Sequence, residues 1–336
     1  MNAAPVLAFP IASGAHCRSA TEITCVSYGA ELDAAWDDLV ARARNGHFML
    51  TRRFLAYHGD RFEDRSVLFI RGNKPVAAIS LHQEGSTWIS HRGLPFGGLI
   101  AAPELTTELT MTIFRELGIR MQAAGVKYLR YTPTPHAYQT QPFEDDLFVL
   151  HSLGARLESM KLAARVRLPR VGLLQERVRK YLKHRVSRIR VEHGIALAEF
   201  WAGLTGYLRD RHGASPTHTE TEMVDLLCRF PDSIKLMGIR NARKQLVAGS
   251  LVFLTDTVIR FQYAFGAGDP AAPKQSMLAL DQAAIRKFGP GRRWLDFGTS
   301  MRPSDGSLDQ QLHAQKERSG GRGMRVETWV WDGSNA

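Results

Sequence analysis

Two parts of the sequence, about 170 residues apart, predict the same order of secondary-structure elements. Hydrophobic alternation and turn residues in the first part indicate two strands, a helix and a strand, at 66–71, 76–81, 106–124 and 127–132. The second part indicates three strands, a helix and a strand, at 234–240, 247–254, 258–265, 274–288 and 294–297. Strands that alternate with helices form mixed sheets with helices packed on them. The sequence therefore predicts a β-β-α-β unit that occurs twice.

The two parts also share short sequence patterns. The similar pairs are IRGNKPVAAI at 70–79 with IRNARKQLVAGS at 239–250, and KYLRYTP at 127–133 with RWLDFGT at 293–299. A chain of 336 residues accommodates about two domains, and we expect an N-terminal domain at 20–165 and a C-terminal domain at 166–336. The composition, 44% hydrophobic and 23% charged, excludes a disordered or collagen-like chain.

The positive charge of the chain is concentrated between the two units. Residues 161–193 contain eleven Lys or Arg against two Glu and so contribute +9 of the net charge of +11. Apolar residues at three- and four-residue spacing predict a basic amphipathic linker helix at 173–193. One interpretation is a solvated linker. The other is a docking surface for phosphate or nucleic acid through Arg185 and Arg188.

Several classes of protein are excluded by simple features. The three cysteines are widely spaced and form no CxxC pair, which argues against a zinc site or a disulfide framework and favours a reducing compartment. Residues 1–15 lack the basic start of a signal peptide. No apolar run approaches the ~20 residues of a membrane span. We therefore expect a soluble, cytoplasmic protein without a membrane span.

Four segments of the second half carry a resemblance to a known family. They are KYLKHRVSRIRVEHG at 180–194, RHGASPTHTETEMVDLLCRFP at 211–231, WLDFGTS at 294–300 and SLDQQLHAQKERSGGRG at 307–323. In this order they resemble the FemAB-like branch of the GNAT acyltransferase superfamily. That branch includes peptidoglycan-bridge aminoacyltransferases and acetyltransferases of polysaccharide and cellulose gene clusters. The first half of the chain is similar in pattern only.

The resemblance implies an α/β (α+β) fold of two tandem GNAT-like mixed-sheet domains joined by the basic helix. It also implies an N-acyltransferase that moves an acyl group from acyl-CoA to an amine of a cell-envelope sugar, peptide or small metabolite. Acyl-CoA would be a donor substrate, and no permanently bound cofactor or metal is expected. The chain departs from single-domain acetyltransferases because it lacks their Arg/Gln-x-x-Gly-x-Gly/Ala pattern.

In GNAT folds the pyrophosphate of the donor lies at the start of the helix after the central strands, where free N–H groups and the helix dipole favour an anion. The resemblance therefore implies a cofactor-binding segment made of Gly266, Gly268, Lys274, Gln275 and Ser276. An ordinary glycine-containing loop with a helix cap is the alternative.

The remaining candidates follow the last two motifs. In the resemblance, Lys316 is the motif lysine near the transferred acyl group, where a positive charge stabilises an oxyanion. Arg322 lies in the cationic turn that follows, and Ser300 ends the preceding strand. Asp296, on that strand, is either part of a base relay or a structural acceptor for backbone N–H groups.

Strand 258–265 and the segment before 219 supply three more candidates. Tyr263 is a candidate acid toward the leaving thiol, beside Gln262, with a core aromatic as the alternative. His218 corresponds to the family's Pro-x-His, which implies a contact with the acceptor, and a polar surface histidine at a helix start is the alternative. It precedes a helix with Thr219 as N-cap and Glu222 completing a capping box. Since no Ser–His–Asp pattern or GxSxG motif occurs, direct attack of the amine is expected.

Two other functions stay open. The first is an aminoacyl-tRNA-dependent transferase of the peptidoglycan-bridge type, for which the basic helix would dock tRNA. The bridge enzymes insert a long coiled-coil arm here, whereas this chain has room for one ordinary helix. The second is a non-catalytic binding protein that keeps the fold.

Overall fold

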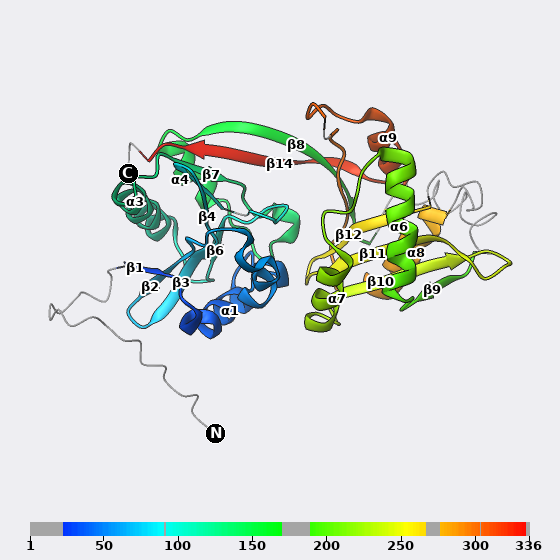
Figure 1. Ribbon diagram of the computed structural model, residues 1–336. Coiled ribbons are helices and arrows are strands. Elements are labelled where there is room, and N and C mark those ends of the chain that lie inside the picture. Colours follow the sequence, from blue (N-terminus) through cyan, green and yellow to red (C-terminus); the bar gives the residue numbers. More distant parts are fainter. Residues whose placement is uncertain (1–22, 91, 170–188, 267–275, 303, 334–336) are drawn as a thin grey trace, which may run out of the picture.

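The computed structural model describes residues 23–90, 92–169, 189–266, 276–302 and 304–333 (Figure 1). Within them, one four-stranded sheet has the order β1 (Ile23–Ser27), β2 (Val67–Arg71), β3 (Lys74–Ile79) and β6 (Leu99–Ala101). The other sheet has ten strands, whose order is β4 (His82–Glu84), β5 (Thr87–Ile89), β7 (Tyr128–Tyr131), β14 (Arg322–Trp331), β8 (Arg156–Arg167), β13 (Trp294–Thr299), β12 (Val258–Phe265), β11 (Leu246–Leu254), β10 (Ile234–Arg240) and β9 (Val191–His193).

Helices cover both parts of the molecule. The N-terminal half, which we define as the chain up to the end of α4, contains α1 (Asp33–Arg42), α2 (Arg52–Leu55), α3 (Thr107–Ala123) and α4 (Asp145–Ser152). The C-terminal half, from β9 to α9, contains α6 (Leu197–His212), α7 (Glu220–Arg229), α8 (Ser276–Phe288) and α9 (Gln310–Arg318). Short 3-10 turns include η3 (Ala56–Arg61) and η4 (His136–Tyr138). No helix in these described ranges is long and apolar enough to cross a membrane.

The duplicated unit predicted from the sequence is present. Each half has an antiparallel hairpin, β2–β3 or β10–β11, and a parallel strand pair, β5–β7 or β12–β13. Helix α3 precedes β7, and α8 connects β12 to β13. The first hairpin turns at Gly72, whose φ of 60° suits glycine. The prediction of a mixed α/β fold with two similar units is confirmed.

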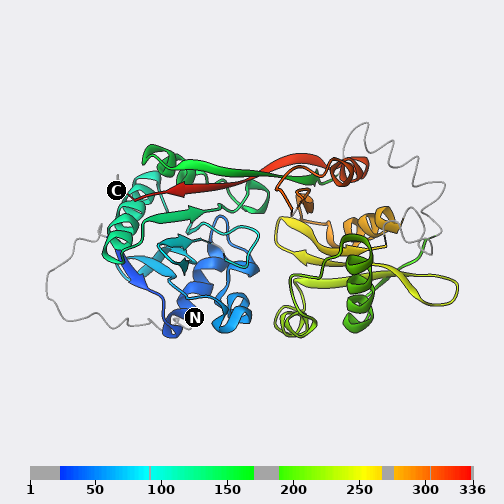
Figure 2. The same cartoon turned by 45° about the horizontal axis from the view of Figure 1, so that its top comes forward.

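A long two-stranded ribbon, β8 with β14, joins the halves (Figures 1 and 2). β14 pairs antiparallel with β8 along its length, from Arg322↔Arg165 to Val330↔Arg156. Near its end it also pairs with β7 of the N-terminal half, at Trp331↔Leu129. The strand near the C-terminus is therefore built into the sheet of the N-terminal half. The predicted domain boundary at residue 165 stays a prediction. β14 belongs to the predicted C-terminal domain by sequence but pairs with β7 of the N-terminal half.

The predicted basic helix at 173–193 is wrong at its C-terminal end. Val191–His193 form strand β9, which pairs antiparallel with β10 at Met237↔His193. The reason is that β10 offers an edge of unpaired backbone groups, and pairing with it overrides the local helical pattern. Residues 170–188, which include Arg185 and Arg188, lie outside the described residues.

Aromatic side chains pack the two halves against each other. Phe48 and Phe54 of the N-terminal half contact Phe230 and Phe253 of the C-terminal half, with Phe48–Phe230 and Phe48–Phe253 ring centroids 5.3 and 5.5 Å apart. Phe54 is 1% exposed. Edge-to-face pairs of this kind stabilise beyond the area that they bury.

We expect Phe54→Ala to lower the free energy of unfolding by about 3–5 kcal/mol, because it opens a cavity where the halves meet. Urea denaturation followed by circular dichroism measures the change. Phe148→Ala is the control, since Phe148 is 58% exposed and its loss is expected to cost less than ~0.5 kcal/mol. Equal losses in the two variants would show that this aromatic contact adds nothing.

Candidate active site

The parallel strands β12 and β13 pair over a short distance and then separate. Their register contains Val258↔Trp294, Ile259↔Leu295 and Arg260↔Asp296. Beyond the last of these pairs, β12 continues to Phe265 and β13 to Thr299 with no further pair in the described register. Strands that separate in this way leave backbone groups at their carboxyl ends available to a ligand.

A β-bulge in β12 lies at this point of separation. Phe261 pairs with Val252 and Tyr263 with Leu251, so Gln262 has no partner residue on β11. The side chain of Gln262 accepts a hydrogen bond from Nε of Arg260 (3.0 Å), which places the two on the same side of the strand. Bulges re-aim side chains and are common beside active sites.

Asp296 is the fully buried centre of a charged cluster. Its Oδ2 accepts from the Tyr138 hydroxyl (2.6 Å) and lies 3.2 Å from Nε of Arg165 and 3.4 Å from Nη1 of Arg260. Its Oδ1 accepts from the backbone N–H of Gly298 (2.7 Å). Burial would raise the pKa of Asp296, but the two guanidinium groups and the hydrogen bonds outweigh it and lower the pKa to about 2. A carboxylate this acidic is a poor base, which favours the structural one of its two predicted roles.

Lys316 lies close to this cluster on α9. Asp309 caps the helix by accepting from the N–H of Leu312. The Lys316 Nζ donates to the carbonyl oxygens of Gly298 (3.1 Å) and Thr299 (2.7 Å), which end β13. Burial lowers the pKa of Lys316 to about 8, against the opposing charge of Asp296. The ammonium is therefore held at the separation of β12 and β13 and is charged at neutral pH.

A chain of three hydrogen-bonded side chains crosses from one half to the other. The His218 backbone N–H donates to the Tyr263 oxygen (3.2 Å), and the Tyr263 hydroxyl is also hydrogen-bonded to Nδ1 of His218 (2.6 Å). On the other side of the ring, Nε2 of His218 is hydrogen-bonded to the Tyr57 hydroxyl of η3 (3.3 Å). Burial lowers the pKa of His218 and raises that of Tyr263, so both are neutral near pH 7.

The capping box predicted beside His218 is present. Thr219 accepts from the N–H of Glu222, and the Glu222 carboxylate accepts from the N–H of Thr219. Glu222 also pairs with Arg61 of the N-terminal half. The two hydrogen bonds of the capping box and the ion pair with Arg61 fix the start of α7. His218, the residue before the N-cap, is thereby held next to Tyr263.

Other predicted site residues lie at the edges of this region. Ser300 is fully buried, 3.3 Å from Nδ1 of His313. Arg322 begins β14 and donates to the Gly321 carbonyl. Gly266 ends β12 with a φ of 110°, and a Cβ there would lie 2.5 Å from that of Ala248, so only glycine fits. Ser276, the first residue of α8, is 1% exposed. Gly268, Lys274 and Gln275 lie outside the described residues.

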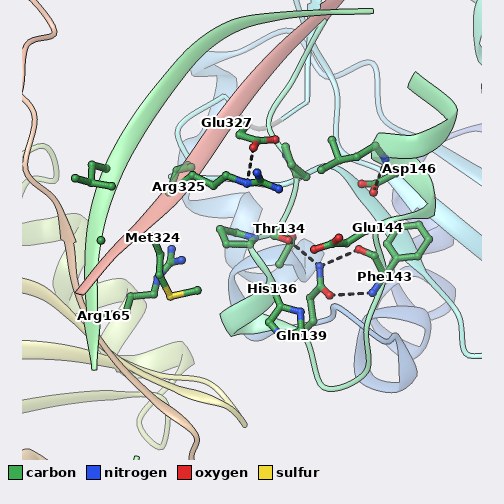
Figure 3. Close-up of a pocket in the computed structure, with 16 residues that line it drawn as sticks. Thr134, His136, Gln139, Phe143, Glu144, Asp146, Arg165, Met324, Arg325 and Glu327 are labelled. Carbon is green, nitrogen blue, oxygen red and sulfur yellow. Dashed lines mark hydrogen bonds and ion pairs between the residues drawn. The ribbon is translucent and has the colours of Figure 1, made fainter. Parts of the chain in front are cut away.

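A cavity of about 480 Å³ lies beside the Asp296 cluster, between the β8–β14 ribbon and residues 133–147 (Figure 3). Arg165, 2% exposed, forms part of its wall. In the sequence, Arg165 is one of the charges of the basic segment, and no motif marks Tyr138 or Arg260. An arginine within the apolar stretch LAARV at 162–166 is the signal that could have marked Arg165 as buried.

No group of three or more His, Cys, Asp or Glu that could hold a metal ion occurs in the part of the chain that the structure describes.

No family model matches the sequence, and no curated protein matches it significantly. Solved structures do match along nearly the whole chain. One entitled crystal structure of FemX has a TM-score of 0.63 at 12% identity and covers 92% of this chain and 97% of its own. A tandem GNAT protein from the clavulanic acid biosynthesis pathway has a TM-score of 0.53 at 12% identity, covering 94% and 100%. L-PGS from Bacillus licheniformis has a TM-score of 0.57 at 13% identity, covering 90% and 92%.

These similarities identify the fold. The chain has a FemAB-like fold built from two GNAT-type units, as the motifs predicted. At 12–13% identity the neighbours say nothing further about substrate, because one fold serves many reactions.

Proposed function

We propose that this protein is an N-acyltransferase that moves an acyl group from acyl-CoA to an amine. The observation that supports this most is the separation of β12 and β13 beyond Arg260↔Asp296, with the Lys316 ammonium at its edge. A thioester carbonyl placed there meets a fixed positive charge and the backbone of the bulge at Gln262. Fixed donors that face a developing oxyanion lower the barrier of acyl transfer.

The donor is proposed to bind at the start of α8. The pyrophosphate of CoA would lie against Gly266, Gly268, Lys274, Gln275 and Ser276, where the N–H groups of the first helical turn favour an anion. Ser276 supports this placement, since its hydroxyl is buried and has no hydrogen-bond partner among the described residues.

The chemical step needs one proton to move from the amine to sulfur. As the amine nitrogen attacks the carbonyl carbon, its proton passes to the Tyr263 oxygen while the Tyr263 proton passes to Nδ1 of His218. The C–S bond then breaks, and the reverse transfer through Tyr263 protonates the CoA sulfur. Lys316 stabilises the oxyanion between these steps. Gln262, Ser300 and Arg322 are proposed to lie along the substrate path, and His218 next to the acceptor.

The proposed acceptor is an amine of a cell-envelope sugar, a peptide or a small metabolite, in a cytoplasmic setting where acyl-CoA is present. Motifs shared with acetyltransferases of polysaccharide gene clusters support this choice. The fold similarity to a tandem GNAT protein, solved without AcCoA, supports an acyl-CoA as the donor.

Titration calorimetry with acetyl-CoA tests the donor site. We expect Ser276→Asp to weaken binding at least tenfold, because it adds a negative charge where the pyrophosphate would lie. Thr107→Asp adds the same charge at the first residue of α3 and is expected to leave binding unchanged. Ser276→Ala adds no charge but removes the hydroxyl that would donate to the pyrophosphate, and it is expected to weaken binding less than Ser276→Asp does. No acetyl-CoA binding to the wild-type protein would exclude this donor.

The second candidate is an aminoacyl-tRNA-dependent transferase, which the +9 charge of residues 161–193 favours. It predicts salt-dependent binding of charged tRNA that weakens when Arg185 and Arg188 are both replaced by alanine. Filter binding between 50 and 200 mM salt, roughly the range over which phosphate contacts weaken, measures it. Equal binding by the double variant removes this docking surface.

A further inference from the structure

The cavity beside the Asp296 cluster has the dimensions of a small-molecule site. Its volume of about 480 Å³ falls within the ~300–1,000 Å³ of ligand pockets. The apolar part of its lining comes from both the ribbon and the N-terminal half, namely Pro133, Pro135, Phe143, Leu147, Leu162, Met324 and Val326. Polar and charged side chains make up the rest of the lining, and they supply the groups that would orient a ligand.

Arg165 supplies a donor without an acceptor. Its Nη1 is buried and makes no hydrogen bond within the described ranges of the chain. Its Nε lies 3.2 Å from Asp296 Oδ2 but is not aligned for a hydrogen bond. A buried donor without a partner costs about 1–3 kcal/mol. Since Arg165 lines the cavity, an acceptor in the cavity would remove that cost.

The charges around Arg165 do not balance. Arg165 and Arg260 both face Asp296, which is the single carboxylate that pairs with them among the described residues. The neighbouring Tyr138 adds no negative charge, because burial raises its pKa, and His47 adds no positive charge, because burial lowers its pKa to about 3. The buried guanidinium of Arg165 and the half-buried one of Arg260 therefore share one carboxylate, and the excess positive charge favours an anion.

The other end of the cavity has the opposite character. Figure 3 shows Arg165 at one end and Asp146 at the other, with Glu144 and Glu327 nearby. Asp146 accepts from the Tyr131 hydroxyl and the Leu147 N–H, and Glu327 pairs with Arg325. These acids are engaged or exposed, and Arg325, the second arginine of the lining, pairs with Glu327, so the favourable place for an anion is at Arg165.

We propose that this cavity binds an anionic small molecule whose carboxylate or phosphate group accepts hydrogen bonds from Arg165. Arg165 lies opposite Asp296 in the ladder of β8 and β13, so the bound molecule is next to the separation of β12 and β13. The role of the bound molecule rests on the proposed function, in which it is the acceptor of the acyl group. The acceptor is then an amine that also carries an acidic group.

Titration calorimetry on the full chain tests the site without turnover. The probes are succinate, inorganic phosphate and succinamide, which has the size of succinate but no charge. We expect saturable binding of succinate or phosphate and none of succinamide. Binding of succinate alone identifies a carboxylate ligand, and binding of phosphate alone identifies a phosphate ester.

Two pairs of variants locate the binding. Arg165→Gln is expected to weaken it at least tenfold, whereas Arg167→Gln, an exposed position on the same strand, is expected to leave it within twofold. Leu147→Trp fills the cavity from the opposite wall without touching the charged cluster and is expected to abolish binding. Met160→Trp, on an exposed part of β8, is its control.

The proposal is overturned if neither anion binds the wild-type protein, or if the Gln variants at 165 and 167 lose equal affinity. A properly folded Leu147→Trp protein that still binds the anion also overturns it, and its circular dichroism spectrum and melting temperature establish the folding. Failure of the proposed function is a separate result: the anion binds at Arg165, but acetyl-CoA does not bind the same protein.

Discussion

Replacing Lys316 with alanine is expected to lower kcat by about 10²- to 10³-fold, which is the usual effect of removing one fixed donor to an oxyanion. The side chain is held by the Gly298 and Thr299 carbonyls and does not pack in an apolar core, so the fold should survive. Release of CoA thiol in the presence of an amine acceptor measures the rate. Since the pKa of Lys316 is about 8, the wild-type rate should also fall as the pH rises through 8.

Arg318→Ala is the matched control for this change. Arg318 lies on the same helix two residues later and is exposed, so its loss is expected to leave kcat within twofold. Lys316→Arg keeps a charge that does not titrate, and its residual activity should lose the alkaline fall. Unchanged turnover in Lys316→Ala would remove this residue from the mechanism and favour a non-catalytic protein.

Replacing Asp296 with asparagine is expected to destabilise the fold by about 3–5 kcal/mol, because the buried guanidinium of Arg165 and the half-buried one of Arg260 lose their only paired carboxylate within the described residues. The same ion pairs predict acid sensitivity. The folded pKa of Asp296 is about 2, below the ~3.9 of an unfolded aspartate. Its contribution is therefore present above about pH 4 and is lost as the pH falls toward 2.

Urea denaturation at pH 7 and pH 3.5 measures both effects. Asp225→Asn is the control, because Asp225 pairs with Arg229 on the exposed side of α7, where such pairs contribute about 0.3–0.5 kcal/mol. The wild-type protein should lose more stability between the two pH values than Asp296→Asn does. A similar cost for the two substitutions would mean that the buried cluster is not needed for folding.

The elements of the fold could be predicted from the sequence because their signals are local. The strands at 234–240 and 258–265 have the predicted bounds, and alternation and turn residues mark both. The capping box of Thr219 and Glu222 depends on a three-residue spacing. The order of four motifs in the second half was enough to indicate the FemAB-like fold.

The candidate site could be predicted only in part, because its central contacts join distant segments. Tyr138 and Asp296 are 158 positions apart, and Tyr57 and His218 are 161 apart. No local pattern connects such residues. Arg165 was counted with the basic segment, since sequence alone does not separate a buried arginine from a solvated one. Lys316, Asp296, Tyr263 and His218 could be named as candidates from their motifs, but their contacts with one another and with distant residues could not.

The position of β14 has a consequence for how the protein is made. This strand lies between β7 and β8, so the sheet of the N-terminal half is complete only after the ribosome has passed Trp331. Until then β7 and β8 expose unpaired edges, which favour misassembly. The N-terminal unit therefore finishes folding last although it is synthesised first, and a fragment that stops before residue 322 should aggregate where the full chain does not.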